Sequence, residues 1–381
     1  MNHPPVLIFS GRLLPASETF VKAQAEGLHS FTPYYAGARR VEGLSMPTER
    51  TIVVNAGGYI AKAQELLFKQ MGYAPQFYRT VRRLQPKLIH AHFGVCGALA
   101  LPLAKAIQRP LIVTFHGFDA SMTDAYARRD SISTRVYLRR RDALKQNAAR
   151  FIAVSQFIKE KLIAKGFAAH KIWVRYIRID THQFQPDEAI PRQRVVLFVG
   201  RLVEKKGCKD LIQAMAKVQA SDPNIQLVVI GDGPLRTELE TQARQALQQY
   251  QFLGLQPSSV VKEWMNRAMV LAVPSVTTAD GDTEGLPTVV AEAQAMGLPV
   301  VGTVHAGIPE AVLHEKTGLL CAERDWQAIA DHILTLFNQP QTWQSFSHKG
   351  RERMLNQFDL STQIQKLEEF YHEVLSNPGF G

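Results

Sequence analysis

The sequence predicts an α/β protein made of two Rossmann-like domains, each with a doubly wound parallel sheet. At 381 residues the chain is longer than one hydrophobic core ordinarily requires. Short apolar runs alternate with segments of helical periodicity, which is the pattern of parallel strands joined by covering helices. The alternation stops once, at a polar, proline-containing segment over residues 181–194, and then begins again. We expect the two domains to face each other across a cleft that binds the ligand.

The first series of apolar runs predicts the N-terminal domain, residues 1–186. Strands are expected over residues 6–10, 51–55, 88–92, 111–115, 151–154 and 172–176. Helices are expected between them, over residues 18–29, 60–71, 97–107, 134–146 and 156–165.

The second series predicts another domain, residues 187–360. Its strands are expected over residues 195–199, 226–230, 250–253, 269–273 and 299–302, and its helices over residues 208–219, 235–248, 258–267, 288–296 and 326–337. Residues 361–381 follow, with apolar side chains at helical spacing from Ile364 to Val374. We expect this last helix to pack back across the N-terminal domain.

Composition is that of a soluble globular protein, with 46% hydrophobic and 20% charged residues. No run approaches the roughly 20 apolar residues of a membrane-spanning helix, and the first apolar run is too short for a signal peptide. Cys96, Cys208 and Cys321 stand singly, without metal-ligand or redox spacing. We therefore expect a cytoplasmic protein.

Charge is divided unevenly between the two halves. Residues 1–186 hold 27 Lys or Arg against 11 Asp or Glu, a net charge of +16, whereas residues 187–381 have a net charge of −6. Such asymmetry points to an anionic partner that meets the first half. Nucleic acid, anionic lipid and a phosphorylated acceptor all remain open from charge alone. A surface that rests on the anionic inner leaflet is one interpretation of the clustered cations, and a solvated face is the other. They gather at Arg79, Arg82, Arg83, Arg135, Arg139, Arg140, Arg141, Lys145 and Arg150.

The motif E-G-L-P-T-V-V-A-E places two carboxylates, Glu284 and Glu292, after the strand predicted at residues 269–273. Proline suits the first turn of a helix, so the helix is expected to begin near Pro287, with Glu284 in the loop before it. Backbone N–H groups at a helix start suit a phosphate, and carboxylates nearby can accept hydrogen bonds from sugar hydroxyls. A helix with one acidic residue at its N-terminus and one solvated acidic residue is the alternative interpretation.

A second motif joins the first strand and first helix of this domain. Gly200 permits a tight turn and Gly207 opens the helix, while Arg201 and Lys206 place two cations where a diphosphate would lie. Lys205 is expected to face solvent. A basic cluster without a ligand is the alternative, but its position between a strand end and a helix start favours a binding role.

Gly-rich turns follow two further strands, at Gly231 and at Phe252, Leu253 and Gly254. They would let backbone groups approach a base.

In combination, these motifs closely resemble glycosyltransferase family 4, a group of retaining enzymes with the GT-B fold, and the resemblance covers nearly the whole chain. It implies that Arg201 and Lys206 bind the donor diphosphate, Glu292 the ribose, Glu284 the transferred sugar, and the turn at Phe252 and Leu253 the base. The donor site so implied also includes Gly11, in the turn expected after the first strand, and Gly200, Gly231, Gly285, Leu286, Pro287 and Thr288.

The first half resembles the branch that builds exopolysaccharides such as colanic acid and amylovoran. The resemblance rests on P-A-S-E-T-F after the first strand, H-A-H-F-G at residues 90–94 and F-H-G-F-D at residues 115–119. It implies that His116 approaches the donor sugar. We expect Ser17, Glu18, Thr19, His92 and Phe118 to bind the acceptor. Alternation along the strand sends His90 and His92 to the same face, and we favour His92 because it lies nearer the carboxyl end.

The chain departs from the family pattern at two places. Many members have a double-glycine turn after the first strand, whereas here Gly11 is followed by Arg12. Arg178 stands where a glycine is common. Asp280 and Asp282 resemble a D-x-D metal element of another fold, but we interpret them as a solvent-exposed loop. The cations already supply positive charge, so no metal and no cofactor are expected.

The predicted activity is hexosyl transfer from a nucleoside-diphosphate sugar, UDP favoured over GDP, to a lipid-linked or growing glycan. The expected partners are this donor, a glycan or polyprenyl-diphosphate-linked acceptor and the anionic inner face of the plasma membrane, without nucleic acid. A sugar-nucleotide epimerase or glycan phosphorylase of the same fold is the alternative. A nicotinamide-dependent oxidoreductase is disfavoured because G-x-G-x-x-G follows neither first strand.

Overall fold

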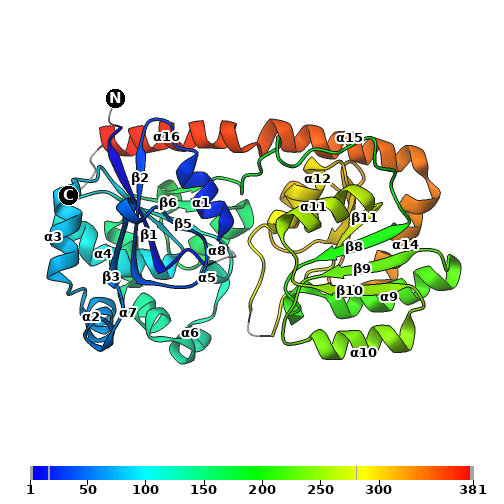
Figure 1. Cartoon of the computed structure of the whole chain (residues 1–381), viewed down its shortest axis with the longest axis horizontal. Helices are drawn as coiled ribbons and strands as arrows, with labels where there is room; N and C mark the ends of the chain where they lie inside the picture. Colours follow the sequence, from blue (N-terminus) through cyan, green and yellow to red (C-terminus); the bar gives the residue numbers. More distant parts are fainter. Residues whose placement is uncertain (1–2, 16–17, 280, 378–381) are drawn as a thin grey trace. The chain divides into compact units, whose positions relative to one another are not determined.

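The structure, a computed structural model, describes residues 3–15, 18–279 and 281–377 (Figure 1). The chain divides into two compact units. Unit 1 contains Met1–Tyr176 and Ser361–Gly381, and unit 2 contains Ile177–Leu360. Each unit is built on one parallel sheet covered by helices, so the predicted fold class is confirmed.

Unit 1 contains a seven-stranded parallel sheet in the order β3-β2-β1-β4-β5-β6-β7. Its apolar strands are buried on both faces because helices cover both. The strands are β1 (Pro5–Leu13), β2 (Thr32–Arg40), β3 (Thr51–Asn55), β4 (Ile89–His92), β5 (Leu111–Phe115), β6 (Arg150–Ala153) and β7 (Ile172–Val174). The helices are α1 (Thr19–Glu26), η1 (Thr48–Arg50), α2 (Tyr59–Met71), α3 (Pro75–Leu84), α4 (Gly94–Ile107), α5 (Phe118–Ser121), α6 (Asp124–Asp130), α7 (Ile132–Asn147), α8 (Gln156–Ala164) and η2 (Ala169–Lys171).

The strand β2 was not predicted, because Pro33 and Gly37 argue against a strand interior. In the structure β2 pairs with β1 from its first residue, Thr32 opposite Pro5, whereas its pairing with β3 begins only at Tyr35. Pro33 therefore lies before the second ladder starts. The helices α3 and α6 were also missing from the prediction.

Unit 2 contains a six-stranded parallel sheet in the order β10-β9-β8-β11-β12-β13. One hydrophobic core under this sheet includes Val196, Leu211, Ile212, Val229 and Ile333. The strands are β8 (Val195–Val199), β9 (Gln226–Ile230), β10 (Tyr250–Gly254), β11 (Val270–Val273), β12 (Val300–Thr303) and β13 (Gly318–Cys321), of which β13 was not predicted. The helices are η3 (Glu204–Lys206), α9 (Cys208–Ser221), α10 (Arg236–Ala246), α11 (Ser258–Arg267), α12 (Thr288–Ala295), α13 (Ile308–Ala311), α14 (Trp326–Asn338) and α15 (Pro340–Gln357).

The last helix, α16 (Leu360–Ser376), packs on unit 1 with its apolar face. The Glu368 carboxylate accepts hydrogen bonds from the backbone N–H groups of His29 and Ser30 at 2.8 and 2.5 Å. The Tyr371 hydroxyl lies 2.6 Å from His90 Nδ1 of β4. Over the described ranges, none of the helices combines the length and apolarity needed to cross a bilayer.

Candidate functional site

The strand order of each sheet reverses direction once. At that point two neighbouring strands are joined to elements on opposite sides of the sheet, and the loops that follow them lie side by side. In unit 2 the reversal falls between β8 and β11, so residues 200–207 adjoin residues 274–279 and 281–287 at the carboxyl edge of the sheet. Ligands of open α/β sheets bind at this position. These two loops contain Arg201, Lys206 and Glu284.

Two glycines let the loops come this close. Gly207 has φ of +65°, and a Cβ at that position would lie 1.7 Å from the Pro274 carbonyl oxygen. Gly231 has φ of +138°, and its Cβ would lie 1.9 Å from the carbonyl oxygen of Gly200. Any larger residue would therefore push the loops after β8, β9 and β11 apart.

Two ion pairs join the loops. Lys206 Nζ lies 2.9 Å from Glu284 Oε1, and Lys205 Nζ donates to Asp282 Oδ1 at 3.0 Å. The prediction that Lys205 faces solvent is wrong, since its side chain is 21% exposed and paired. The same contact shows that Asp282 is not a simple solvent-exposed residue, while Asp280 lies outside the described residues.

Glu284 is buried and ionised. Burial favours its neutral form, but the charges of Lys206 and Lys205 and the Lys206 hydrogen bond outweigh it, so the pKa of Glu284 is held below its ordinary value. At neutral pH this carboxylate can therefore only accept hydrogen bonds, which suits sugar hydroxyls.

A buried histidine holds the backbone of Glu284. The Glu284 N–H donates to His305 Nε2 at 3.1 Å, so Nε2 is an acceptor and the imidazole proton resides on Nδ1. That proton points to Glu323 Oε1 at 2.7 Å. Glu323 in turn accepts hydrogen bonds from the Thr277 N–H and hydroxyl. The sequence did not predict this role of His305 and Glu323. The one feature that pointed to it was the loop T-V-H-A-G-I-P-E, which contains His305.

Arg201 is exposed and lines a pocket of about 510 Å³ together with Lys205, Lys206 and Asp282. The structure thus brings the two predicted cations together in one pocket, where Lys206 also meets Glu284. Three cations and the carboxylates of Glu204 and Asp282 line this open pocket, and cations so placed suit a diphosphate.

Helix α12 begins at Thr288, one residue after Pro287, which has φ of −63°. The preceding residues are fixed, since Leu286 is buried and the Gly285 carbonyl accepts from the Gly307 N–H at 2.9 Å. Glu292 lies one turn into the helix. Burial raises its pKa to about 7, although a hydrogen bond with Thr288 opposes the shift. Among the described residues, no ion pair links Glu292 to the Lys206–Glu284 pair.

The predicted base-binding turns lie along the same carboxyl edge. The Gly200 N–H donates to the Ile230 carbonyl, and the Gly231 N–H donates to the Gly254 carbonyl at 2.8 Å. The ends of β8, β9 and β10 are therefore contiguous. Phe252 and Leu253 are half-buried at this edge, with Phe252 packed against the core.

In unit 1 the strand order reverses between β1 and β4. The prediction that Gly11 forms a turn after β1 is wrong, because β1 pairs with the unpredicted β2 as far as Leu13. Gly11 instead lies within the strand, and its N–H donates to Cys96 Sγ at 3.1 Å. Arg12, which follows it, is exposed.

The two predicted histidines of unit 1 are in contact. His92 Nδ1 lies 3.0 Å from His116 Nε2, and the rings stack. Phe20 and Phe93 also pack on His116, with ring centroids 4.9 and 4.6 Å away. Phe93 has φ of +73°, a conformation that costs a bulky residue energy and that clusters at functional sites. His90, by contrast, is bonded to Tyr371 and Thr114.

Asp119, which sequence reasoning did not single out, fixes the loop that carries His116. Its buried carboxylate accepts hydrogen bonds from the backbone N–H groups of Gly94, His116 and Gly117 at 2.7 to 3.0 Å. Burial raises the pKa of Asp119, and these hydrogen bonds oppose the shift. The position of Asp119 within the F-H-G-F-D motif was the available signal.

The other predicted acceptor residues lie at two helix starts. Glu18 precedes α1, where burial raises its pKa to about 7 against the opposing charge of Arg12 and a Ser10 hydrogen bond. Thr19 is the exposed first residue of α1. Phe118 opens α5 and packs edge-to-face on Tyr126. Ser17 lies outside the described residues.

Two family models match the chain in succession. "Glycosyltransferase Family 4" matches residues 27–183, and "Glycosyl transferases group 1" matches residues 180–353.

Curated relatives show the same likeness. The chain is 34% identical to the amylovoran biosynthesis glycosyltransferase AmsK of Erwinia amylovora over 251 residues, which is 64% of this chain and 60% of AmsK. It is 32% identical over 284 residues to the putative colanic acid biosynthesis glycosyltransferase WcaL of Escherichia coli K12, which is 72% of this chain and 67% of WcaL. The aligned chain thus spans less than two thirds of AmsK.

Among solved structures, the Anabaena HepE protein in complex with UDP and glucose superposes with a TM-score of 0.77 at 20% identity, covering 97% of this chain and 99% of HepE. Sucrose-phosphate synthase from Thermosynechococcus elongatus also gives a TM-score of 0.77, at 21% identity, covering 98% of this chain and 100% of the synthase. These likenesses extend the GT-B resemblance to both units. With its two consecutive domain matches and its similarity to WcaL, the chain belongs to the glycosyltransferases of family 4.

Proposed function

We propose that this chain transfers a hexose from a UDP-sugar to a hydroxyl of a lipid-linked or growing glycan, with retention of anomeric configuration. The relatives AmsK and WcaL are named for amylovoran and colanic acid biosynthesis, which supports a role in bacterial exopolysaccharide, capsule or lipopolysaccharide synthesis. UDP is favoured over GDP because HepE binds UDP and UDP-glucose. The anionic inner face of the plasma membrane is the proposed location.

The observation that carries this proposal is the contact of Lys206 with Glu284 beside the pocket that Arg201 lines. Lys206 would bind the diphosphate while keeping Glu284 ionised, and Glu284 would accept hydrogen bonds from the sugar. The two groups thereby hold the phosphate and the sugar on either side of the bond that breaks.

In the proposed reaction, the bond from the anomeric carbon to the diphosphate oxygen breaks as the acceptor oxygen bonds to that carbon. The acceptor proton moves to a phosphate oxygen of the departing UDP. Arg201 and Lys206 stabilise the negative charge that develops on this leaving group. His116, supported by His92 and Asp119, would contact the transferred sugar, and Glu292 the ribose. We propose that no metal or cofactor is needed.

A panel of UDP- and GDP-sugars, scored by release of nucleoside diphosphate with and without chelator, tests the donor and metal proposals. Lys206→Met and Glu284→Gln should each lower turnover at least 100-fold, since each removes a group that acts on the leaving phosphate or sugar. Lys209→Met, on the exposed pair with Glu238, is the matched control and should retain turnover. Near-normal turnover in both site variants would refute the site.

Product analysis separates the alternatives. An epimerase would convert the donor sugar without an acceptor, and a phosphorylase would require inorganic phosphate. Either result would replace the proposed transfer.

A further inference from the structure

The exposed hydrophobic residues of the described chain are concentrated in one short segment of unit 1. Six of the ten large apolar side chains that are exposed fall within residues 59–73. Monomeric proteins seldom expose such a patch unless it binds something. The six are Tyr59, Ile60, Leu66, Leu67, Met71 and Tyr73.

Five of these residues form a stripe on one face of α2. At 100° per residue, Tyr59, Ile60, Leu66, Leu67 and Met71 fall within an arc of about 140°. The opposite face holds the buried Glu65 and Phe68 and packs on the protein. Helix α2 therefore has apolar side chains on two faces: Phe68 is buried in the protein, and the stripe is exposed to solvent.

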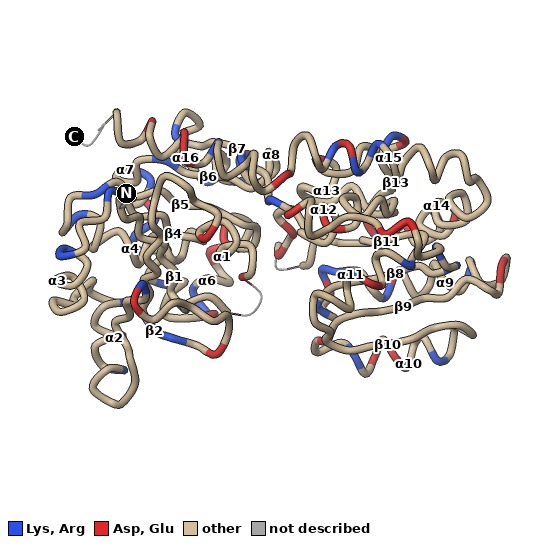
Figure 2. The backbone as a smooth tube through the Cα atoms, turned by 45° about the horizontal axis from the view of Figure 1, so that its top comes forward, with Lys and Arg blue, Asp and Glu red and all other residues tan. Residues whose placement is uncertain are grey.

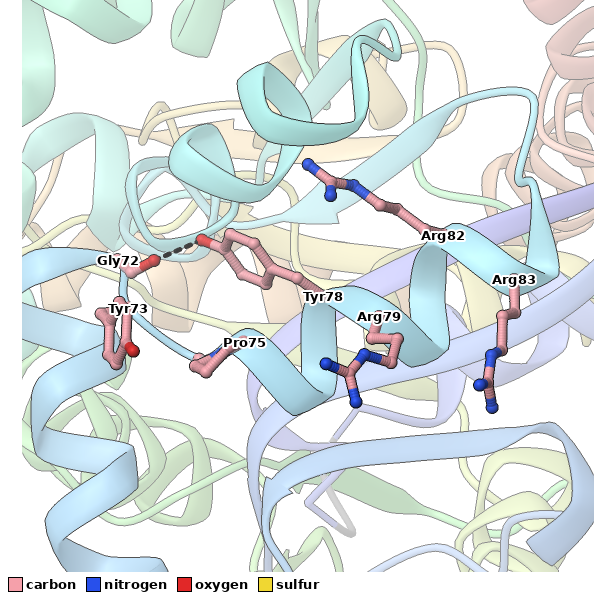
Figure 3. Close-up of a pocket in the computed structure, with 8 residues that line it drawn as sticks. Gly72, Tyr73, Pro75, Tyr78, Arg79, Arg82 and Arg83 are labelled. Atoms are coloured by element: carbon pink, nitrogen blue, oxygen red, sulfur yellow. Dashed lines mark hydrogen bonds between the residues drawn. The ribbon is translucent and has the colours of Figure 1, made fainter.

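A basic pocket of about 510 Å³ adjoins this stripe, on α3 and the turn before it (Figure 3). Arg79 and Arg83, one helical turn apart, extend to the same side of α3, and Arg82 extends to the other side. The Arg82 guanidinium donates to the Ala106 carbonyl at 2.7 Å, whereas no carboxylate of the described chain pairs with Arg79 or Arg83. The Tyr78 hydroxyl donates to the Gly72 carbonyl at 2.5 Å and holds the turn.

A second, apolar pocket of about 460 Å³ shares Tyr73, Ala74 and Pro75 with the basic one. Val53, Leu67 and Phe77 line it, from β3, α2 and α3. Cationic and apolar surfaces are thus continuous across one turn, which matches a molecule with an anionic head and a hydrocarbon tail.

Three of the α7 cations, which the sequence suggested as part of a membrane-facing surface, make contacts within the protein. Arg140 donates to the carbonyl oxygens of Ala98 and Gln70, and Arg141 forms a bidentate pair with Asp124. Lys145 pairs with Asp142. Arg135 of α7 stays exposed. Among the described residues that adjoin the α2 stripe, Arg79, Arg83 and Lys62 are exposed cations without a carboxylate partner.

We infer that α2 and α3 dock unit 1 onto an anionic lipid bilayer, with the α2 stripe among the acyl chains and Arg79 and Arg83 on lipid phosphates. The inference rests on the proposed function, because a lipid-linked acceptor calls for an enzyme at a membrane. Residues 59–83 hold five Lys or Arg and one acidic residue, the buried Glu65. A symmetric interface with a second copy would therefore oppose like charges, which disfavours that occupant.

Vesicle sedimentation of the full chain tests the inference with phosphatidylcholine alone and mixed with phosphatidylglycerol. Wild-type protein should bind the mixed vesicles far more strongly. Arg79→Gln with Arg83→Gln should weaken that binding roughly tenfold to thirtyfold, given the attraction of each basic residue to an anionic surface. Arg128→Gln with Arg129→Gln, on the exposed end of α6, is the matched control and should change it little.

Ile60→Ser with Met71→Ser tests the apolar stripe and should also weaken binding, since these side chains are 79% and 72% exposed and their loss should not unfold the protein. Leu255→Ser with Leu355→Ser replaces exposed apolar residues elsewhere and should have no effect. Equal binding to neutral vesicles, equal effects of test and control pairs, or a dimer that these variants dissociate would each overturn the inference. UDP binding by wild type and the same variants is measured alongside. Wild-type protein that binds vesicles but does not bind UDP would refute the proposed function and not the docking surface.

Discussion

At the scale of single residues, Glu284 is held twice, by Lys206 at its carboxylate and by His305 at its backbone N–H. The second contact depends on an unprotonated Nε2. A protonated imidazole would present an N–H to the Glu284 N–H and break the contact.

We predict that His305→Ala lowers kcat/KM for the donor about ten- to a hundredfold, because it leaves a buried N–H unsatisfied at a cost of about 1–3 kcal/mol. His305→Asn, whose amide oxygen can accept, should recover part of the loss. Steady-state kinetics of wild type and the two variants checks the mechanism. Unchanged kcat/KM in His305→Ala would contradict the positioning role.

Glu292 makes stability depend on pH. Its pKa is about 7 in the folded protein against an ordinary 4.5. The neutral carboxyl is therefore favoured by folding, and the stability it contributes is complete below about pH 4.5 and is lost as pH rises through 7. The shift corresponds to a loss on the order of 3 kcal/mol.

Glu292→Gln should remove this dependence. Urea unfolding at pH 5 and pH 8 should show wild type losing stability relative to the variant as pH rises. The comparison between the two proteins cancels other titrating groups, among them Glu18, whose pKa is also raised to about 7. A constant difference between wild type and variant at both pH values would contradict the assignment.

At the scale of elements, the chain leaving β9 passes so close to the chain leaving β8 that a glycine is required at position 231. We predict that Gly231→Ala destabilises the protein and abolishes UDP binding, because its Cβ would lie 1.9 Å from the Gly200 carbonyl oxygen. Gly57→Ala is the matched control. Its φ of +127° is similar, but nothing lies within 4 Å of its Cβ, so it should cost only about 1 kcal/mol of backbone strain. Urea unfolding and UDP titration compare them, and equal losses would show that collision is unimportant.

Most elements could be predicted because buried parallel strands are continuous apolar runs, such as those of β5 and β8. The strand β2 was not predicted, since Pro33 and Gly37 are unusual inside a strand, and β13, which begins at Gly318, was also missed. The error at β2 also caused the error at Gly11, because pairing with β2 is what extends β1 to Leu13.

The candidate site could be predicted as far as strand ends could be located. Functional side chains just after β8 and β11 meet at the carboxyl edge of the sheet, whatever conformation the loops adopt. The partners within the site could not be assigned: a sequence does not say that Lys205 meets Asp282 or that Glu323 supports His305. Those pairings depend on loop conformation.

At the scale of the whole molecule, positive charge serves different purposes in the two units. Figure 2 shows Lys and Arg spread over unit 1, whereas unit 2 mixes both signs. In unit 2 the loop cations face carboxylates and a pocket of about 510 Å³, so binding there should respond to a nucleotide. In unit 1 the α3 arginines adjoin an apolar stripe, so that surface should respond to lipid.

Hydrogen exchange on the full chain should therefore separate the two ligands. UDP should slow exchange in residues 199–207 and 276–292, because a diphosphate held by Arg201 and Lys206 would also tie down the loops that carry them. Residues 59–83 should be unaffected by UDP, while anionic vesicles should protect residues 59–83 and leave the nucleotide loops unchanged. Lys206→Met should lose the UDP effect and keep the vesicle effect, and Arg79→Gln with Arg83→Gln should do the reverse. Protection of residues 59–83 by UDP alone would mean that the α3 arginines belong to the nucleotide site, and the division of roles between the units would be wrong.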